Sequence, residues 1–266
     1  MNEKAVNVAL VGAGPGAPDL ITVRGLRYLQ SADVVIHDRL VSPQLLKECK
    51  SEVRLINVGK APHRNRFPQE EINAILVEQA LSGKRVVRLK GGDPFVFGLG
   101  SSEAIALANA GVAFEVVPGI SSSIALTGLA GIPLTMKDQL TSFTVLSGHY
   151  PPGHPKSSDF DNISQNGMVV VLMGRKNISL ITSRFISNGW SPDTKVALIA
   201  SGTTSQETIL LTTLSNASTV AETLFPPLTI VIGKGVDLRP QLLPHLQQTQ
   251  YNKSDDAWGT SREIGE

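Results

Sequence analysis

Short apolar segments alternate with amphipathic segments through the first half of the chain. Five apolar runs have the composition of buried strands, at residues 7–11, 34–37, 53–58, 86–89 and 114–117. Three segments between them have helical spacing or composition, at residues 19–30, 68–81 and 102–110. Pro68 suits the first turn of the second helix, and Gly83 ends that helix. This alternation predicts an α/β domain with a largely parallel sheet and helices on its faces.

The pattern changes in the second half. Residues 131–141 (GIPLTMKDQLT) break the alternation and indicate an interdomain connection. Further apolar strands follow, with fewer clear helices between them, and ETILLT after a short turn predicts an antiparallel hairpin. The second domain is therefore expected to be α/β with a mixed sheet. We predict four segments: an N-terminal domain at 1–134, a linker at 135–141, a C-terminal domain at 142–246 and a disordered polar tail at 247–266.

Composition narrows the functional classes. The 266 residues carry a formal net charge of +1, and aromatic residues make up only 5%, so neither nucleic acid nor a membrane is an expected partner. The single cysteine, Cys49, excludes an internal disulfide framework and fits a reducing compartment. No apolar run reaches the length of a membrane span, and the N-terminus reads as a first strand. We expect a cytoplasmic protein.

Glycine, proline and charged residues follow each predicted strand of the first domain. They lie in five segments: Gly12–Gly16, Asp38–Leu40, Val58–Lys60, Lys90–Pro94 and Val117–Ser122. Any one of them alone is ordinary turn chemistry. In a parallel sheet, however, all five converge on one edge, which is where open α/β sheets bind ligands. The sequence therefore predicts a binding site at this edge.

GAGPG after the first strand, with Asp38 after the second, also suggests a nicotinamide-dinucleotide fold. The fit is poor because Pro15 interrupts the glycines and the third glycine of that motif is missing. Proline also removes a backbone N–H of the kind that binds pyrophosphate. The loop is better suited to close backbone approach to a neutral or zwitterionic ligand, or to the other domain.

Cations concentrate at the same strand ends, although the whole chain is nearly neutral. They are Arg39, Lys60, His63, Arg64, Arg66, Arg88 and Lys90. A solvated basic surface is one explanation, and a site for a small polyanion is the other, since arginine matches carboxylate geometry. The sequence has no cysteine pair, HxxxH or clustered acidic ligand set, so no metal site is expected.

The motifs LVGAGPG, ADVVIHDRLVS, PQEEIN, GKRVVRLKGGDPFVFG and FEVVPGISS, followed by AGIPLT, VLMG and ASGT, resemble the uroporphyrinogen-III C-methyltransferases of the tetrapyrrole methylase family. The resemblance covers about Val6 to Val236. It implies two α/β domains with a ligand cleft between them and a homodimer. It also implies C-methylation of uroporphyrinogen III at C-2 and C-7, with S-adenosylmethionine as donor, to give precorrin-2 for sirohaem or cobalamin.

The resemblance also implies roles for individual residues. Asp38 would accept a proton and Lys60 would donate one. The donor contacts would be Pro15, Gly91, Gly92, Asp93, Val96, Ser121, Ser122, Met173 and Gly202. The acceptor's carboxylates would meet Arg39, Arg64 and Lys137. Paired glycines would let the backbone approach the donor, and Phe95, Val96 and Phe97 would form an apolar wall, with one of the two phenylalanines in the core.

The sequence departs from the family pattern mainly on the acceptor side. Leu99 stands where relatives have arginine, Ser102 where they have glutamate, Met136 where they have histidine and Lys137 where they have arginine. Ala17 replaces an aspartate in the first loop. Three hypotheses remain open: an active uroporphyrinogen-III methyltransferase with an altered acceptor site, an enzyme that methylates another tetrapyrrole, and a non-catalytic paralogue that binds the donor.

Overall fold

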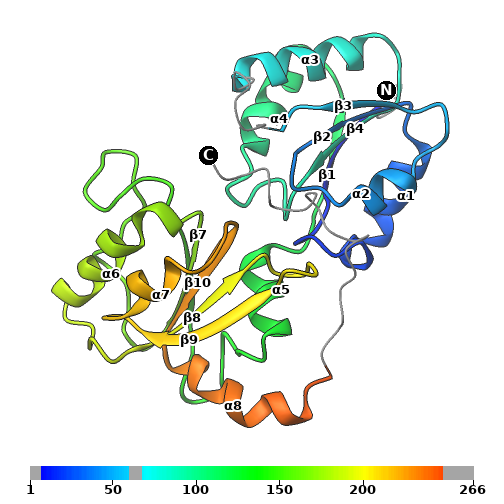
Figure 1. Cartoon of the computed structure of the whole chain (residues 1–266). Coiled ribbons are helices and arrows are strands. Elements are labelled where there is room, and N and C mark those ends of the chain that lie inside the picture. The colour runs from blue at the N-terminus through cyan, green and yellow to red at the C-terminus, as the bar shows by residue number, and fades with distance from the viewer. Residues whose placement is uncertain (1–6, 60–67, 248–266) are drawn as a thin grey trace. The chain divides into compact units, whose positions relative to one another are not determined.

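The computed structural model describes residues 7–59 and 68–247, and the chain forms two compact units that divide between Ser121 and Ser122 (Figure 1). Each unit is an α/β structure built on its own five-stranded sheet. The predicted α/β class, with a largely parallel first sheet and a mixed second sheet, is confirmed. The tail predicted from residue 247 onward lies outside the described residues, apart from Gln247 itself.

The first unit alternates strands and helices along the chain. Its elements are β1 (Val8–Gly12), α1 (Val23–Ser31), β2 (Val34–His37), α2 (Pro43–Lys47), β3 (Arg54–Asn57), α3 (Gln69–Leu81), β4 (Val86–Lys90), α4 (Gly100–Asn109) and β5 (Phe114–Val117). The strand order is β3-β2-β4-β1-β5, and every neighbouring pair is parallel. The five carboxyl ends therefore lie along one edge of the sheet, as the sequence predicted.

Both faces of this sheet are covered, which is why its central strands are apolar at nearly every position. On one face Leu29 of α1 and Leu45 of α2 pack against Val11, Val35 and Val87. On the other face α3 and α4 cover the alternate residues of the same strands. Figure 1 shows these two helix pairs on opposite sides of the sheet.

The predicted helix at 19–30 is two elements. A short 3-10 turn covers Pro18–Leu20, and α1 begins only at Val23. The break occurs at Thr22, whose backbone is extended and whose hydroxyl accepts the Gly25 N–H (3.1 Å) as the helix N-cap. An N-cap satisfies an otherwise unpaired helix donor, so capping chemistry outweighs the leucine periodicity here. Similarly, Pro68 precedes α3 as its N-cap residue instead of occupying the first turn.

The second unit is built on a mixed sheet. Its elements are α5 (Ser122–Leu129), β6 (Phe143–Ser147), β7 (Met168–Leu172), α6 (Ile178–Ser187), β8 (Lys195–Ala200), β9 (Thr208–Thr213), α7 (Ala217–Ala221), β10 (Leu228–Ile232) and α8 (Arg239–Leu242). The strand order is β6-β7-β10-β8-β9. Within this sheet β6 and β7 pair in parallel, the other pairs are antiparallel, and β8 and β9 form the predicted antiparallel pair.

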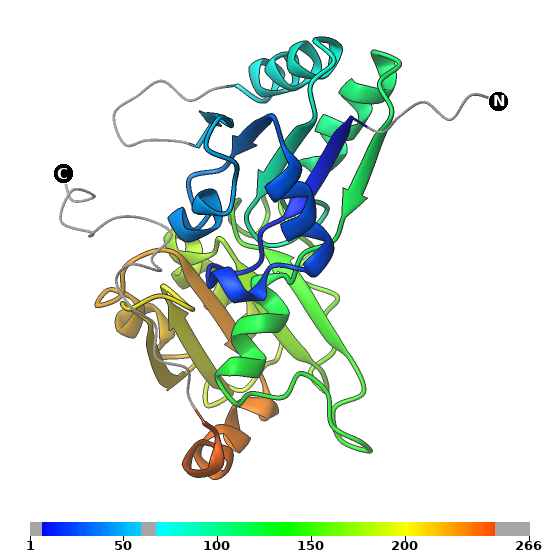
Figure 2. The ribbon, with the colours of Figure 1, turned by 90° about the vertical axis from the view of Figure 1, so that its right-hand side faces the viewer.

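The division into units differs from the predicted boundary at residue 134. Helix α5, which the sequence analysis did not identify, packs on β7 and β10 and so groups with the second unit. Its Leu126 joins the cluster that covers one face of the second sheet, and α6 and α7 cover the other face. In Figure 2 the green helix α5 lies against the strands of this sheet. No helix of the described segments is long and apolar enough to cross a membrane.

Three glycines meet at the carboxyl edge of the first sheet. A Cβ added to Gly119 would lie 2.2 Å from the Gly92 carbonyl oxygen and 2.6 Å from the Gly12 Cα. A Cβ at Gly12 would likewise meet Gly119 Cα at 2.5 Å. Since real Cβ contacts are never so short, the loops after β1, β4 and β5 can approach this closely only without side chains.

We predict that Gly119→Ala destabilises the protein by about 1–3 kcal/mol, because the new methyl group overpacks this junction. Gly128→Ala is the matched control. Gly128 lies in α5, and outside the backbone of that helix no atom of the described residues comes within 4 Å of the place that a Cβ would take. Alanine there should be neutral or stabilise the helix by up to about 1 kcal/mol. Urea unfolding of both variants measures the difference, and equal stabilities would contradict the prediction.

Candidate active site

The loops after β1 and β4 are joined at the carboxyl edge of the first sheet. The Gly14 N–H donates to the Gly92 carbonyl (3.2 Å), and the Gly92 N–H donates back to the Gly14 carbonyl (2.7 Å). Pro15, a predicted donor contact, follows directly and is half-buried. The prediction that these two glycine-rich loops lie at one edge of the sheet is therefore correct.

Gly91 and Gly92 differ from Gly12 and Gly119 because a Cβ at either position would make only ordinary van der Waals contact with the described residues. Among the described residues, the nearest atom to a Cβ at Gly91 is Leu40 Cβ at 3.9 Å, and at Gly92 it is Ser121 Cα at 3.9 Å. Gly92 also has a positive φ of 66°, a conformation that favours glycine. A ligand can thus approach this backbone directly, between the Asp38 loop and Ser121.

The Asp93 carboxylate holds two loops together. Its Oδ1 accepts the Phe95 N–H (2.8 Å), and its Oδ2 accepts the Gly119 N–H (3.0 Å). The resemblance implied that this residue contacts the donor. In the structure it accepts two backbone hydrogen bonds, so it fixes the loop after β4 against the loop after β5.

The segment after Asp93 presents apolar side chains to solvent. Phe95 is 56% exposed and Phe97 is 43% exposed, and Val96 is also exposed. The expectation that one of the two phenylalanines belongs to the core is therefore wrong. Phe97 and Leu99 both have positive φ, 54° and 59°, which is uncommon for such side chains. The local backbone is held by the Asp93 hydrogen bonds, and this turns the apolar side chains outward.

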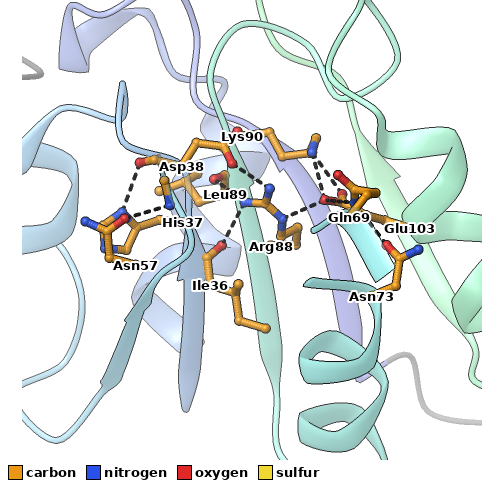
Figure 3. Close-up of polar contacts among 11 residues, drawn as sticks. Ile36, His37, Asp38, Asn57, Gln69, Asn73, Arg88, Leu89, Lys90 and Glu103 are labelled. Carbon is orange, nitrogen blue, oxygen red and sulfur yellow. Dashed lines mark hydrogen bonds and ion pairs between the residues drawn. The ribbon is translucent and has the colours of Figure 1, made fainter. Parts of the chain in front are cut away.

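Four charged side chains form a cluster beneath this edge (Figure 3). Arg88 Nη2 donates to Asp38 Oδ1 (2.5 Å), and Arg88 Nε donates to Glu103 Oε1 (2.9 Å). Lys90 Nζ donates to the same Glu103 oxygen (3.0 Å) and lies 2.9 Å from Oε2. Gln69 also donates to Glu103 Oε1 (3.4 Å). The charges of the two cations are thus balanced by those of the two carboxylates.

Burial sets the electrostatics of this cluster. Burial opposes the charge of Arg88, but the carboxylates of Asp38 and Glu103 outweigh it and raise the pKa of Arg88. Burial lowers the pKa of Lys90, and the neighbouring Arg88 adds to this, against the effect of both carboxylates. Burial also lowers the pKa of His37, whose ring nitrogen Nδ1 lies 3.0 Å from the Asp38 carbonyl oxygen.

The charged cluster shows that two residues of the predicted basic site do not face a ligand. Arg88 and Lys90 were grouped with the cations that would bind a polyanion, but they are buried in β4 and paired within the protein. Glu103, which is fully buried at the start of α4, was not among the residues predicted from the sequence. One signal was available: residues 88 and 90 lie two apart and so share a face of the strand, where two buried cations need acidic partners.

The remaining predicted residues of the first unit are split between described and undescribed segments. Arg39 is half-buried beside Asp38, and a Cβ at Gly59 would meet its backbone N at 2.3 Å, so the loops after β2 and β3 are in close contact. Ser121 is buried at the end of the loop after β5. Lys60 and Arg64 lie outside the described residues, and their roles stay predictions.

Three predicted donor contacts belong to the second unit: Ser122, Met173 and Gly202. Strands β7 and β8 both pair antiparallel with β10, so they run in the same direction and their carboxyl ends share one edge. Met173 follows β7 and Gly202 follows β8. A Cβ at Gly202 would lie 2.5 Å from a methyl group of Leu126, so Gly202 packs closely against α5 and an alanine there would require Leu126 to shift.

Strain marks this second edge as well. Met173 (φ 58°), Ser201 (φ 48°) and Thr203 (φ 62°) all adopt left-handed backbone conformations. The turn is held by hydrogen bonds from the Thr203 N–H to Glu207 (2.7 Å) and from the Thr204 hydroxyl to the Ser201 carbonyl (2.7 Å). Such strain clusters at ligand sites in many proteins. Ser201 and Thr203 flank Gly202 in the ASGT motif, but the sequence did not single them out as site residues.

The positions that depart from the family pattern have distinct surroundings. Ser102 accepts a hydrogen bond from Asn73 Nδ2 (3.0 Å), which places it in the contact between α3 and α4. Leu99 is 58% exposed. In the second unit Met136 pairs through its backbone with Leu140, and Lys137 is exposed. In the described part of the chain, no group of three or more His, Cys, Asp or Glu could hold a metal ion.

An open backbone cradle at the carboxyl edge of a parallel sheet, followed by a second unit with a mixed sheet, defines a class of two-unit α/β ligand-binding proteins. Residues 7–218 match the family described as Tetrapyrrole (Corrin/Porphyrin) Methylases. The chain belongs to this family.

Relatives agree with this assignment. The chain is 44% identical over 235 residues to a uroporphyrinogen-III C-methyltransferase of Methanocaldococcus jannaschii, covering 87% of this chain and 97% of the relative. It is 46% identical over 237 residues to a siroheme synthase of Acinetobacter baylyi, covering 88% of this chain and 52% of the relative. The chain thus spans about half the length of such siroheme synthases.

A solved structure is also similar. It is the uroporphyrin-III C-methyltransferase of Thermus thermophilus complexed with S-adenosyl homocysteine, with a TM-score of 0.75 and 32% identity. The match covers 87% of this chain and 94% of the other.

We predict that Glu103→Gln destabilises the protein by about 3–5 kcal/mol, because it leaves Arg88 and Lys90 buried with too little negative charge. Asp33→Asn is the control. It removes the charge of a surface carboxylate that pairs with Arg85 (2.9 Å) and Lys50 (3.6 Å), where ion pairs contribute about 0–1 kcal/mol, and it keeps an oxygen for the Arg85 backbone N–H. Urea unfolding compares the two. A Glu103→Gln midpoint as close to wild type as that of Asp33→Asn would contradict the prediction.

Proposed function

We propose that this chain transfers methyl groups from S-adenosylmethionine to C-2 and C-7 of uroporphyrinogen III, giving precorrin-2. The observation that carries the proposal is the open backbone at Gly91 and Gly92, next to the Asp38 loop. The family supports methyl transfer to a tetrapyrrole, and the relative from M. jannaschii supports this acceptor.

The donor would be held mainly by backbone. Gly91 and Gly92 offer peptide groups without side chains in the way, and Pro15, Val96 and Ser121 flank the same edge. Ser122, Met173 and Gly202 are the proposed contacts from the second unit. The bound S-adenosylhomocysteine of the Thermus relative supports a donor of this kind. When bound, the donor supplies an electrophilic methyl group on a sulfonium centre.

The protein's own part is to orient the acceptor and to move protons. A pyrrole carbon is already nucleophilic, so correct alignment of the reacting atoms contributes much of the rate enhancement. Asp38 would accept the proton that leaves, and Lys60 would donate one. Asp38 suits this role because its side chain is one-third exposed at the strand edge, with Arg88 holding one oxygen. Arg39, Arg64 and Lys137 would contact the acceptor's carboxylates.

The setting of the reaction is part of the same proposal. We infer a cytoplasmic homodimer whose product supplies sirohaem or cobalamin synthesis, without metal, nucleic acid or membrane as partner. The similarity to siroheme synthases supports the sirohaem route. Sedimentation of the purified chain tests the dimer.

We expect wild-type protein to convert uroporphyrinogen III and S-adenosylmethionine to precorrin-2, detected by absorbance and by the fluorescence of the oxidised product. Asp38→Asn should lower kcat by about 10²–10⁴-fold, because it removes the proton acceptor and leaves a neutral isostere. Asp33→Asn, at the other end of β2, should keep wild-type kcat. Donor binding without methyl transfer to any tetrapyrrole would favour a non-catalytic paralogue instead.

A substitution at Leu99 tests which tetrapyrrole is the acceptor. It is exposed on the loop after β4, where family members carry arginine. If the acceptor is uroporphyrinogen III, we expect Leu99→Arg to raise kcat/KM by about tenfold or more, because it adds a charged contact to a carboxylate. Leu99→Gln is the uncharged control. A fall in kcat/KM with Leu99→Arg would favour a less acidic tetrapyrrole as the acceptor.

A further inference from the structure

Arg88 makes one short contact with the carboxylate of Asp38. Arg88 Nη2 donates to Asp38 Oδ1 at 2.5 Å, and the Arg88 side chain is only 2% exposed. Within the described residues, the other oxygen of Asp38 makes no hydrogen bond or ion pair. One oxygen is thus held from the protein side, while the side chain as a whole keeps one-third of its surface exposed.

Arg88 itself is held by three further contacts. Its Nε donates to Glu103 Oε1 (2.9 Å), and its Nη1 donates to the carbonyls of Leu89 (3.2 Å) and Ile36 (3.4 Å). A planar guanidinium with all three nitrogens engaged cannot rotate without breaking several bonds. The direction in which Arg88 presents Nη2 is therefore fixed by β2, β4 and α4 together.

Lys90 completes the arrangement. It lies on the same face of β4 as Arg88 and forms an ion pair with Glu103 (2.9 Å), so Glu103 is shared between two cations. Asp38 supplies the second negative charge, and the four groups sum to zero. Because an unbalanced buried charge is costly, Arg88 and Lys90 depend on these two carboxylates.

We propose that Arg88 is the positioning residue of Asp38, and that Glu103 acts through Arg88. This inference rests on the proposed function, in which Asp38 accepts a proton. Arg88 fixes one oxygen of Asp38 and so directs the other toward the acceptor. Arg88 does not bind substrate, because its guanidinium is buried and its donors are used within the protein. Lysine cannot replace it, since a single ammonium lacks the fork that reaches Asp38 and Glu103 together.

A double-mutant cycle tests this proposal. Arg88→Met should lower kcat by about 10²-fold and change the acceptor KM by less than about threefold. It leaves Lys90 and Glu103 as a balanced pair, so the fold is expected to survive. In an Asp38→Asn background the same substitution should change kcat by less than about twofold, because Arg88 then has no carboxylate to orient. Single-turnover transfer of a labelled methyl group provides the sensitivity for these slow variants.

Two further variants keep the result interpretable. Arg85→Met, three residues earlier, removes an exposed arginine paired with Asp33 and should leave kcat unchanged. Arg88→Lys keeps the charge without the fork and should stay at least tenfold below wild type. If Arg88→Met does not fold, Arg88→Lys enters the cycle in its place. Equal losses from the Arg88 substitution in wild-type and Asp38→Asn backgrounds would overturn the proposal.

Side-chain NMR separates this inference from the proposed function. The Nη signals of ¹⁵N-labelled Arg88 should be resolved in the wild type, because rotation is restricted, and the Nη2 signal should shift in Asp38→Asn, because its hydrogen-bond partner loses its charge. Wild-type protein that shows this change but does not methylate uroporphyrinogen III would overturn the proposed function and support the positioning of Asp38. Arg88 signals that are unaffected by Asp38→Asn would overturn the positioning role.

Discussion

The cations of β4 impose the constraint on which the first unit depends. Arg88 and Lys90 alternate with apolar residues on a central strand that is covered on both faces, so neither can reach water. Their charges must be matched inside the protein, and the partners come from two other elements, Glu103 from α4 and Asp38 from the end of β2. The cluster therefore connects strand, helix and loop at the place where the proposed chemistry occurs. It also explains why an acidic residue can be fully buried in an otherwise apolar helix face.

The glycines of the same edge divide into two groups with different physical roles. Gly12 and Gly119 are required because neighbouring backbone occupies the space of a side chain. At Gly91 and Gly92 no neighbouring atom of the described protein crowds the position of a side chain, which suits close approach of a ligand to the peptide groups. Asp93 links the two groups, since its carboxylate holds the loop after β4 to Gly119. Packing at one set of glycines thus fixes the position of the other set.

Much of this organisation was predictable from the sequence. Apolar runs at residues 34–37 and 114–117 predicted strands whose bounds the structure repeats, and parallel pairing placed the glycine-rich loops at one edge. Local capping was less visible: Thr22 divides a predicted helix because its hydroxyl accepts a backbone N–H. Helix α5 was missed because its small and apolar residues have no distinct amphipathic pattern before the break at residue 131. It joins the second unit through packing alone.

The sequence by itself determined the class of fold, the strand ends that carry glycine, and the resemblance to the tetrapyrrole methylases. These features follow from local periodicity and from motifs of neighbouring residues. Both are properties of the sequence itself and do not depend on how distant segments pack. Only the tertiary structure decided that Arg88 and Lys90 are buried and neutralised instead of facing a substrate, and that Glu103 is their partner. Charge pairing across 13 to 50 residues of sequence depends on which helix covers which face of the sheet, and no local pattern encodes that choice.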